Sequence, residues 1–258
     1  FEDGVCYPHR GFSCSRNAMP FIGSKLKTFH NFASAALPEI YPRSNLGKSL
    51  RMEANTLESG IFRNDGKGKF TFKALPRMAQ ASPSFGSSFL DATGNGHPDI
   101  FLAQNFFGPQ IETRPMVGGL GLILEGDGNG NFKAISPAAS GIVIPEDAKS
   151  VISSDLNGDG RLDLIVGIND GPTRSFVRTG GPLPYQVSLE GPAGNRHGIG
   201  ARVSIKLSDQ SIRTGEIRAG AGYLSQTPAV FSFTTPEGIS PSSSTIQWPD
   251  GTVTKSLF

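Results

Sequence analysis

Two stretches of nine residues, 64 residues apart, share one polar pattern and constrain the fold more than any other feature. DATGNGHPD runs from Asp91 to Asp99, and DLNGDGRLD runs from Asp155 to Asp163. Oxygen-bearing side chains alternate with glycines in both, a composition typical of tight turns. Each stretch leads into an apolar segment that reads as a buried strand. The sequence therefore predicts a repeated unit of a polar loop followed by a strand.

The oxygens of the second loop predict a calcium site. Ca²⁺ takes about 6–8 oxygen ligands from carboxylates, amides, carbonyls and water. The predicted ligands are the side chains of Asp155, Asn157, Asp159 and Asp163 and the backbone carbonyl of Arg161. An EF-hand would place a glutamate at the twelfth position, which here is Val166, and a strand rather than a helix is expected to follow. The alternative is a turn that binds no metal.

The first loop offers a weaker set of the same ligands. It presents Asp91, Thr93, Asn95, the carbonyl of His97 and Asp99. Two of these side chains are carboxylates, against three in the second loop. Because calcium affinity follows ligand charge, weaker binding is expected here, and whether the first loop is occupied stays open.

A second pair of segments repeats with nearly the same period. IFRNDGKGKF ends at Phe70 and LILEGDGNGNF ends at Phe132. Each combines an apolar strand, an Asp-Gly turn and an aromatic residue, which predicts a β-hairpin. The expected order is hairpin, linker, calcium-type loop and buried strand, repeated once. A β unit that recurs at a fixed period indicates a propeller or a solenoid.

At these residues the chain resembles the FG-GAP/VCBS repeat family, whose repeats are blades of a β-propeller with an Asp-rich calcium loop before a hydrophobic strand. The second loop matches that pattern fully. The first departs from it at Thr93 and Asn95. The resemblance implies a partial propeller over residues 61–182, with calcium as its cofactor.

The C-terminal third, residues 183–258, is similar to the ASPIC/UnbV domain, which typically follows FG-GAP repeats in secreted and cell-surface proteins. The matching residues are Asn195, Arg196, Gly198, Ile199, Gly200, Ala201, Arg202, Gly220, Gly222, Tyr223, Leu224, Ser225, Gln226, Trp248, Pro249, Asp250 and Gly251. Read without the resemblance, this stretch contains short alternating strands joined by turns, which predicts a small β-sandwich or barrel.

Residues 1–60 differ from the rest and are expected to be a partial blade with a helical insertion. Apolar residues from Leu26 to Leu37 recur at helical spacing, with Ser24 as the expected cap and Pro38 as the expected end. SNLGKSLRM predicts a second short helix and ANTLESGIF a strand. Cys6 and Cys14 are either disulfide-bonded or two unrelated thiols.

Composition limits the classes of partner. The 258 residues carry a formal net charge of +2 with dispersed Lys and Arg, which argues against a nucleic-acid surface. No apolar run reaches 18 residues, so no membrane span is predicted. No signal peptide is recognised, and two blades do not close a ring. We therefore expect further blades from a longer chain or from another subunit.

The fold class predicted is mainly β, and the function predicted is a non-catalytic, calcium-stabilised module that binds protein or glycan partners. Its location would be extracellular, periplasmic or at the cell surface. Dispersed histidines and the lack of hydrolase or P-loop motifs weigh against an enzyme. The alternatives are a polysaccharide-active propeller enzyme and a structural subunit of an envelope assembly. Tyr223, Arg202 and Trp248 would line a sugar site or pack the C-terminal domain.

Overall fold

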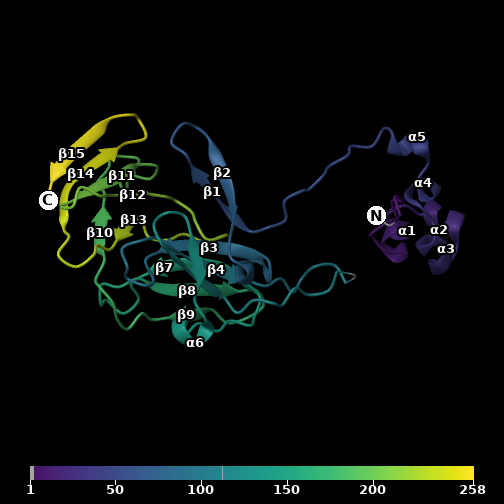
Figure 1. Ribbon diagram of the computed structural model, residues 1–258, viewed down its shortest axis with the longest axis horizontal. Helices are drawn as coiled ribbons and strands as arrows, with labels where there is room; N and C mark the ends of the chain where they lie inside the picture. The colour runs from purple at the N-terminus through teal and green to yellow at the C-terminus, as the bar shows by residue number, and fades with distance from the viewer. Residues whose placement is uncertain (1–2, 112) are drawn as a thin grey trace. The chain divides into compact units, whose positions relative to one another are not determined.

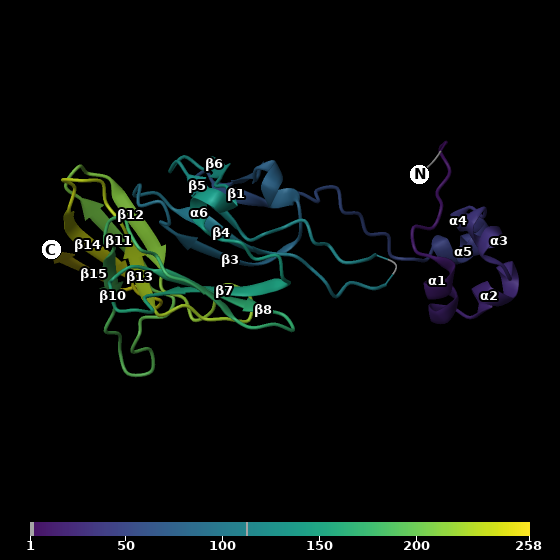
Figure 2. The ribbon, with the colours of Figure 1, turned by 90° about the horizontal axis from the view of Figure 1, so that it is seen from below.

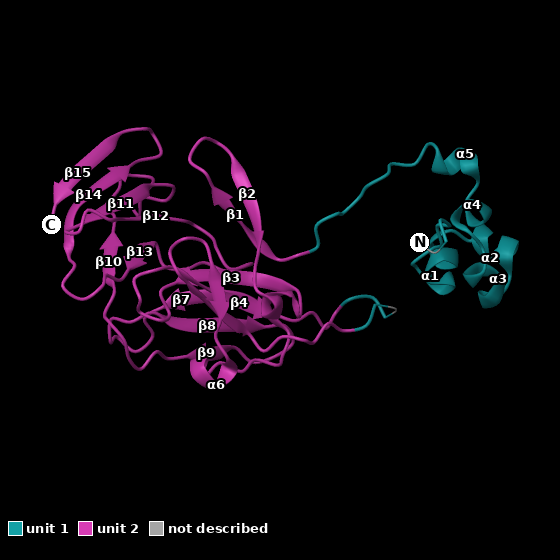
Figure 3. Cartoon of the chain, viewed as in Figure 1, with its two compact units in different colours: residues 1–57, 109–114 teal, residues 58–108, 115–258 magenta. Residues whose placement is uncertain are grey.

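The computed structural model describes residues 3–111 and 113–258. It is mainly β, with antiparallel sheets following a group of short N-terminal helices. The chain divides into two compact units, one of residues 1–57 and 109–114 and one of residues 58–108 and 115–258 (Figure 3). Each unit is described by itself below.

The first unit is a small helical cluster around its own apolar core. Its helices are α1 (Phe12–Ala18), α2 (Phe21–Leu26), α3 (Phe29–Ala33), α4 (Leu37–Ile40) and α5 (Arg43–Leu46). Phe12, Ile22, Phe32 and Ile40 are buried together. Cys6 and Cys14 are not joined by a disulfide bond. None of the described helices is long and apolar enough to cross a membrane.

The single helix predicted from Ser24 to Leu37 is wrong, because the segment breaks into three. Lys27 has a φ of +57° and ends α2, and the Thr28 side chain caps α3 by accepting the backbone N–H of Asn31. Ser24 lies inside α2, and Pro38 lies in the first turn of α4, where its missing N–H costs nothing. The strand predicted over ANTLESGIF begins only at Gly60.

The second unit shows the predicted repeat. The first copy contains hairpin β1 (Gly60–Asn64) and β2 (Phe70–Ala74), the 3-10 turn η1 (Arg77–Gln80), β3 (Ser84–Leu90) and β4 (Asp99–Gln104). The second contains hairpin β5 (Leu122–Gly126) and β6 (Phe132–Ala134), α6 (Pro137–Ser140), β7 (Ala148–Ser154) and β8 (Asp163–Ile168), followed by β9 (Arg174–Phe176). The buried strand expected after each loop is present as β4 and β8.

The repeats form sheets that pack face to face (Figures 1 and 2). The sheet β3-β4-β5-β6 shares one core with the sheet β7-β8-β9, through residues such as Phe101 and Val166. Its opposite face packs Leu102 and Leu124 against Ile61 of the β1–β2 hairpin. Within the described residues these sheets do not form a recognisable closed propeller.

The C-terminal part of the second unit contains two sheets that share a core. A two-stranded sheet pairs β10 (Tyr185–Ser188) with β13 (Val230–Phe233). A four-stranded sheet has the order β12 (Ile212–Glu216), β11 (Arg202–Leu207), β14 (Pro241–Gln247) and β15 (Val253–Leu257). Val203 and Ile205 of the larger sheet pack with Phe233 of the smaller one.

The β5–β6 hairpin makes its turn around one carboxylate, and this predicts an acid-sensitive turn. Asp127 accepts the side-chain N–H of Asn131 and the backbone N–H groups of Asn129 and Asn131, which lower its pKa to about 2. Because the folded pKa lies below the ordinary 3.8, the stabilisation is present above that pH and is lost as pH falls toward 2. An NMR titration of the Asp127 carboxyl carbon should give a midpoint near 2, whereas a midpoint near 3.8 contradicts the turn. An Asp127→Asn variant should lack this part of the acid sensitivity.

Candidate metal centre

The two calcium-type loops are hairpin connections between paired antiparallel strands. In the first repeat the loop joins β3 to β4, where Leu90 pairs with Asp99. In the second it joins β7 to β8, where Ser154 pairs with Asp163. The sheet therefore fixes the ends of each loop, and the residues between them determine its internal shape.

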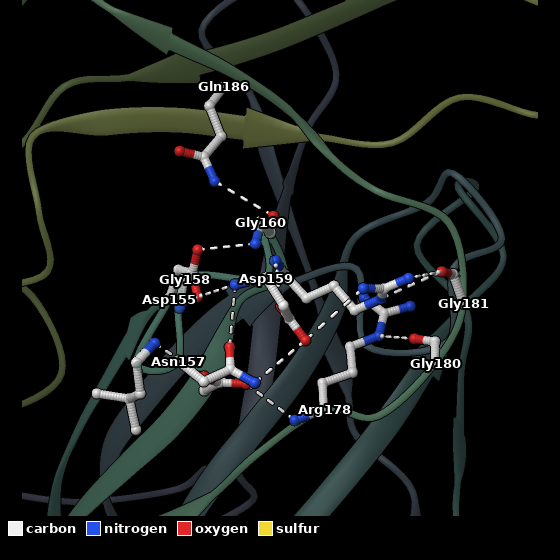
Figure 4. A network of polar contacts seen from close by, with 12 residues as sticks. Asp155, Asn157, Gly158, Asp159, Gly160, Arg178, Gly180, Gly181 and Gln186 are labelled. Atoms are coloured by element: carbon white, nitrogen blue, oxygen red, sulfur yellow. Dashed lines mark hydrogen bonds and ion pairs between the residues drawn. The ribbon is translucent and has the colours of Figure 1, made fainter.

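Asp155 is the centre about which the second loop folds (Figure 4). One of its carboxylate oxygens accepts the backbone N–H groups of Gly158 at 2.8 Å and Asp159 at 3.2 Å, and the other accepts that of Gly160 at 2.8 Å. Gly158 and Gly160 have φ values of +75° and +85°, which L residues adopt at a cost. The alternating glycines thus let three N–H groups converge on one carboxylate.

Asn157 and Asp159 form the outer side of the same loop. The Asn157 amide donates to Asp159 Oδ2 at 3.2 Å, and the backbone N–H of Arg161 donates to Asp159 Oδ1 at 2.9 Å. The Arg161 guanidinium lies 3.6 Å from Asp159 Oδ2. Together these contacts, with the Arg161 backbone N–H first, hold the pKa of Asp159 below its usual value. Asp159 is therefore charged at neutral pH.

Asp163 closes the loop from inside the protein. Its side chain is buried, with 1% of the residue exposed. One oxygen accepts the backbone N–H of Leu156 at 2.9 Å and the other accepts that of Arg178 at 2.8 Å. The carboxylate thus joins the start of the loop to the segment that follows β9.

Contacts that the motif does not predict also anchor this loop. Arg178 donates to the carbonyls of Gly180 at 2.9 Å and Asp91 at 2.8 Å, so it bridges the second loop to the first. Arg161 donates to Gly181 O, and the Gln186 side chain donates to Gly160 O at 3.4 Å. The partners Arg178, Gly181 and Gln186 lie 15 or more positions beyond the loop and follow no recognisable spacing, so only the fold brings them to it.

In the first loop Asp91 takes the place that Asp155 has in the second loop, with one added contact. Asp91 accepts the backbone N–H groups of Gly94 at 2.6 Å, Asn95 at 3.1 Å and Gly96 at 2.8 Å. Its Oδ2 also accepts the hydroxyl of Thr234, a buried residue just after β13. A cation that approached Asp91 would have to compete with this hydroxyl.

The other polar groups of the first loop are also engaged within the protein. The backbone N–H and the hydroxyl of Thr93 donate to Asp99 Oδ2 at 2.8 and 3.0 Å, and Gly126 N donates to Asp99 Oδ1 at 2.8 Å. Asn95 accepts the backbone N–H of His97 at 2.8 Å and donates to Gly126 O. Burial raises the pKa of Asp99 above its usual value.

The second loop fits a calcium ion better than the first. It carries three carboxylates, and Arg161 is the cation paired with one of them. Each carboxylate oxygen can accept more than one partner, so the single backbone N–H on Asp159 Oδ1 leaves capacity for a cation. In the first loop the two carboxylates also receive hydroxyl donors. Over residues 3–111 and 113–258, no three His, Cys, Asp or Glu side chains form a ready-made metal cluster. A calcium ion would therefore bind to a loop whose shape is already set by backbone N–H groups that donate to its carboxylates.

Comparison with known families identifies the C-terminal part of the chain. Residues 191–256 match the family described as ASPIC and UnbV. These residues form an ASPIC/UnbV domain. The same comparison gives no FG-GAP/VCBS match for the repeats. No curated protein sequence matches the chain.

The structure gives the ASPIC/UnbV motif residues specific local roles. The Asn195 side chain bridges a turn by accepting the backbone N–H of Ile199 and donating to its carbonyl, both at 2.8 Å. The Trp248 indole N–H donates to the Thr254 hydroxyl at 2.9 Å. His197 is exposed in its loop. Arg202 and Trp248 line one surface hollow, whereas Tyr223 lies elsewhere, on Phe85.

The segment Gly220–Gln226 attaches the ASPIC/UnbV domain to the repeat sheets. Gly222 O accepts the backbone N–H of Val151 in β7 at 3.0 Å, and the Ser225 hydroxyl donates to Val151 O at 3.2 Å. The Tyr223 ring meets Phe85 of β3 edge to face, with ring centroids 5.4 Å apart. This segment thus forms a contact between the domain and both repeat sheets.

Proposed function

We propose that this chain is a non-catalytic binding module stabilised by calcium at Asp155–Asp163. The observation that supports this most strongly is the composition of the second loop. Its nine residues include the carboxylates of Asp155, Asp159 and Asp163, and the sheet fixes both of its ends. When bound there, Ca²⁺ would neutralise carboxylate charge and tie β7 to β8. Such an ion stabilises the folded state by its binding free energy.

We further propose that the repeats are FG-GAP/VCBS-type blades of a propeller. The sheet β3-β4-β5-β6 is a four-stranded antiparallel meander with a core on each face. Successive meanders packed face to face are the arrangement of neighbouring blades. Further blades would come from elsewhere in the polypeptide or from another subunit. The module would act outside the cell, in the periplasm or at the cell surface, where protein or glycan partners are available.

Calcium addition should raise the unfolding temperature of the chelator-treated protein. At a calcium concentration 100 times the Kd, the expected stabilisation is about 2.7 kcal/mol, or a shift of about 5–10 °C for a domain of this size. Asp159→Ala should lose most of this response, because it removes a charged ligand from a half-buried position.

The matched control is Asp127→Ala. Asp127 also accepts backbone N–H groups in an Asp-Gly turn, but its turn lies between β5 and β6, outside both loops. This variant should keep the full calcium response. An equal response in Asp159→Ala and the wild type would refute the metal assignment, as would the absence of any response in the wild type.

A further inference from the structure

The outward face of the four-stranded sheet in the ASPIC/UnbV domain is polar and positively charged. Val203 and Ile205 of β11 point into the core, so the alternating Arg202, Ser204 and Lys206 point outward. The strand register places Glu216 and Gln247 on either side of Arg202, and Thr214 and Thr245 on either side of Ser204. Lys255 of β15 pairs with Thr245 and extends the same face.

One end of this face is hollowed. The hollow has a volume of about 440 Å³, and its lining includes Arg202, Thr214, Glu216, Arg218, Gln247 and Trp248. A volume of this size accommodates a small molecule or one to two sugar rings, because ligand sites span about 300–1,000 Å³. The lining combines an aromatic ring with hydroxyl, amide and charged groups.

The charges of the hollow are unbalanced. Arg218 Nε lies 3.5 Å from Glu216 Oε2, so these two side chains partly neutralise each other. Arg202 is in no ion pair among the residues that the structure describes. A guanidinium without an ion-pair partner, on the same sheet face as Lys206 and Lys255, favours a ligand that carries a carboxylate.

The indole of Trp248 is held in a fixed position beside these charges. Its N–H is bound to the Thr254 hydroxyl at 2.9 Å. A Cβ added at Gly198 would lie 3.3 Å from the indole, so the absent side chain leaves room for the ring. A fixed aromatic surface suits the apolar C–H face of a pyranose, and the hydroxyl and amide groups of Thr214 and Gln247 suit its hydroxyls.

We propose that this hollow binds an acidic saccharide, with Arg202 on the carboxylate of a uronic acid and Trp248 against its ring. The inference rests on the binding role proposed above and names the partner class, but it does not require calcium. Nucleic acid fits the site less well, because one aromatic side chain and a few cations provide neither a stacking series nor a basic stripe.

Hexagalacturonate is the probe that tests this site, with its fully methyl-esterified form as the uncharged control. Isothermal titration calorimetry of the whole chain should show binding of the acid form, weaker binding at high salt and little binding of the ester. Arg202→Ala should weaken binding by about tenfold or more, since a charge-assisted contact is lost. Arg196→Ala, which removes an exposed arginine of the same domain outside the hollow, should bind as the wild type does.

Three results would overturn the inference: no binding of hexagalacturonate, equal binding by Arg202→Ala, or tighter binding of a single-stranded oligonucleotide that depends on Arg202. The titrations are run with calcium and with chelator. If calcium raises the unfolding temperature but no saccharide binds, only the saccharide inference is wrong. If saccharide binds but calcium does not change the unfolding temperature, only the calcium assignment is wrong.

Discussion

Gly222→Ala should destabilise the second unit by about 3 kcal/mol or more. Gly222 has a φ of +70°, a conformation that alanine adopts only with strain. An added Cβ would also overlap the carbonyl oxygen of Val151, to which this segment is bound. The variant must therefore either separate the ASPIC/UnbV domain from β7 or distort both.

Gly220→Ala is the matched control for that experiment. Gly220 lies in the same segment without a positive φ, and an added Cβ would meet its nearest neighbour, Ser225 O, at an ordinary 3.8 Å. Chemical denaturation should show the control within about 1 kcal/mol of the wild type. A Gly222→Ala protein as stable as Gly220→Ala would show that Gly220–Gln226 does not hold the domain to the sheets.

Asp163→Ala should destabilise the chelator-treated protein by about 3 kcal/mol, the second large effect. The substitution removes the acceptor for the backbone N–H groups of Leu156 and Arg178 at a position that is 1% exposed. Both hydrogen bonds are partly buried, and a donor that loses its acceptor costs about 1–3 kcal/mol, so about 1.5 kcal/mol is expected for each of the two. The effect belongs to the loop itself and needs no metal.

Asp159→Ala separates this structural contribution from metal binding. Asp159 is partly exposed, and without calcium its loss should cost about 1 kcal/mol or less in chemical denaturation. If Asp159→Ala and Asp163→Ala lost similar unfolding free energy in chelator, Asp163 would be no more important to the metal-free loop than Asp159. That result would contradict the structural role assigned to Asp163.

The repeat and its loops could be predicted from the sequence because they depend on local chemistry. Asp-Gly and Asn-Gly pairs fix the turns, and the alternating apolar residues of β8 and β11 fix the strands. The helix expected from Ser24 to Leu37 failed because a positive φ at Lys27 and the cap at Thr28 outweighed the apolar spacing.

The supports of the loops could not be predicted, because they come from distant parts of the chain. Thr234 reaches Asp91 across 143 positions, and Arg178 reaches it across 87. Both belong to elements whose location depends on how the sheets pack. The motif thus predicted the candidate ligands and the lower charge of the first loop, while the distant side chains that support the two loops emerged only from the fold.

Direct measurement of calcium binding decides whether Asp155–Asp163 is a metal centre. Titration of Ca²⁺ into the chelator-stripped chain, followed by calorimetry, should show one dominant site that Asp91→Asn retains and Asp159→Ala loses. Calcium binding that is absent from the wild type, or that persists unchanged in Asp159→Ala, would contradict the assignment of a metal centre to Asp155–Asp163.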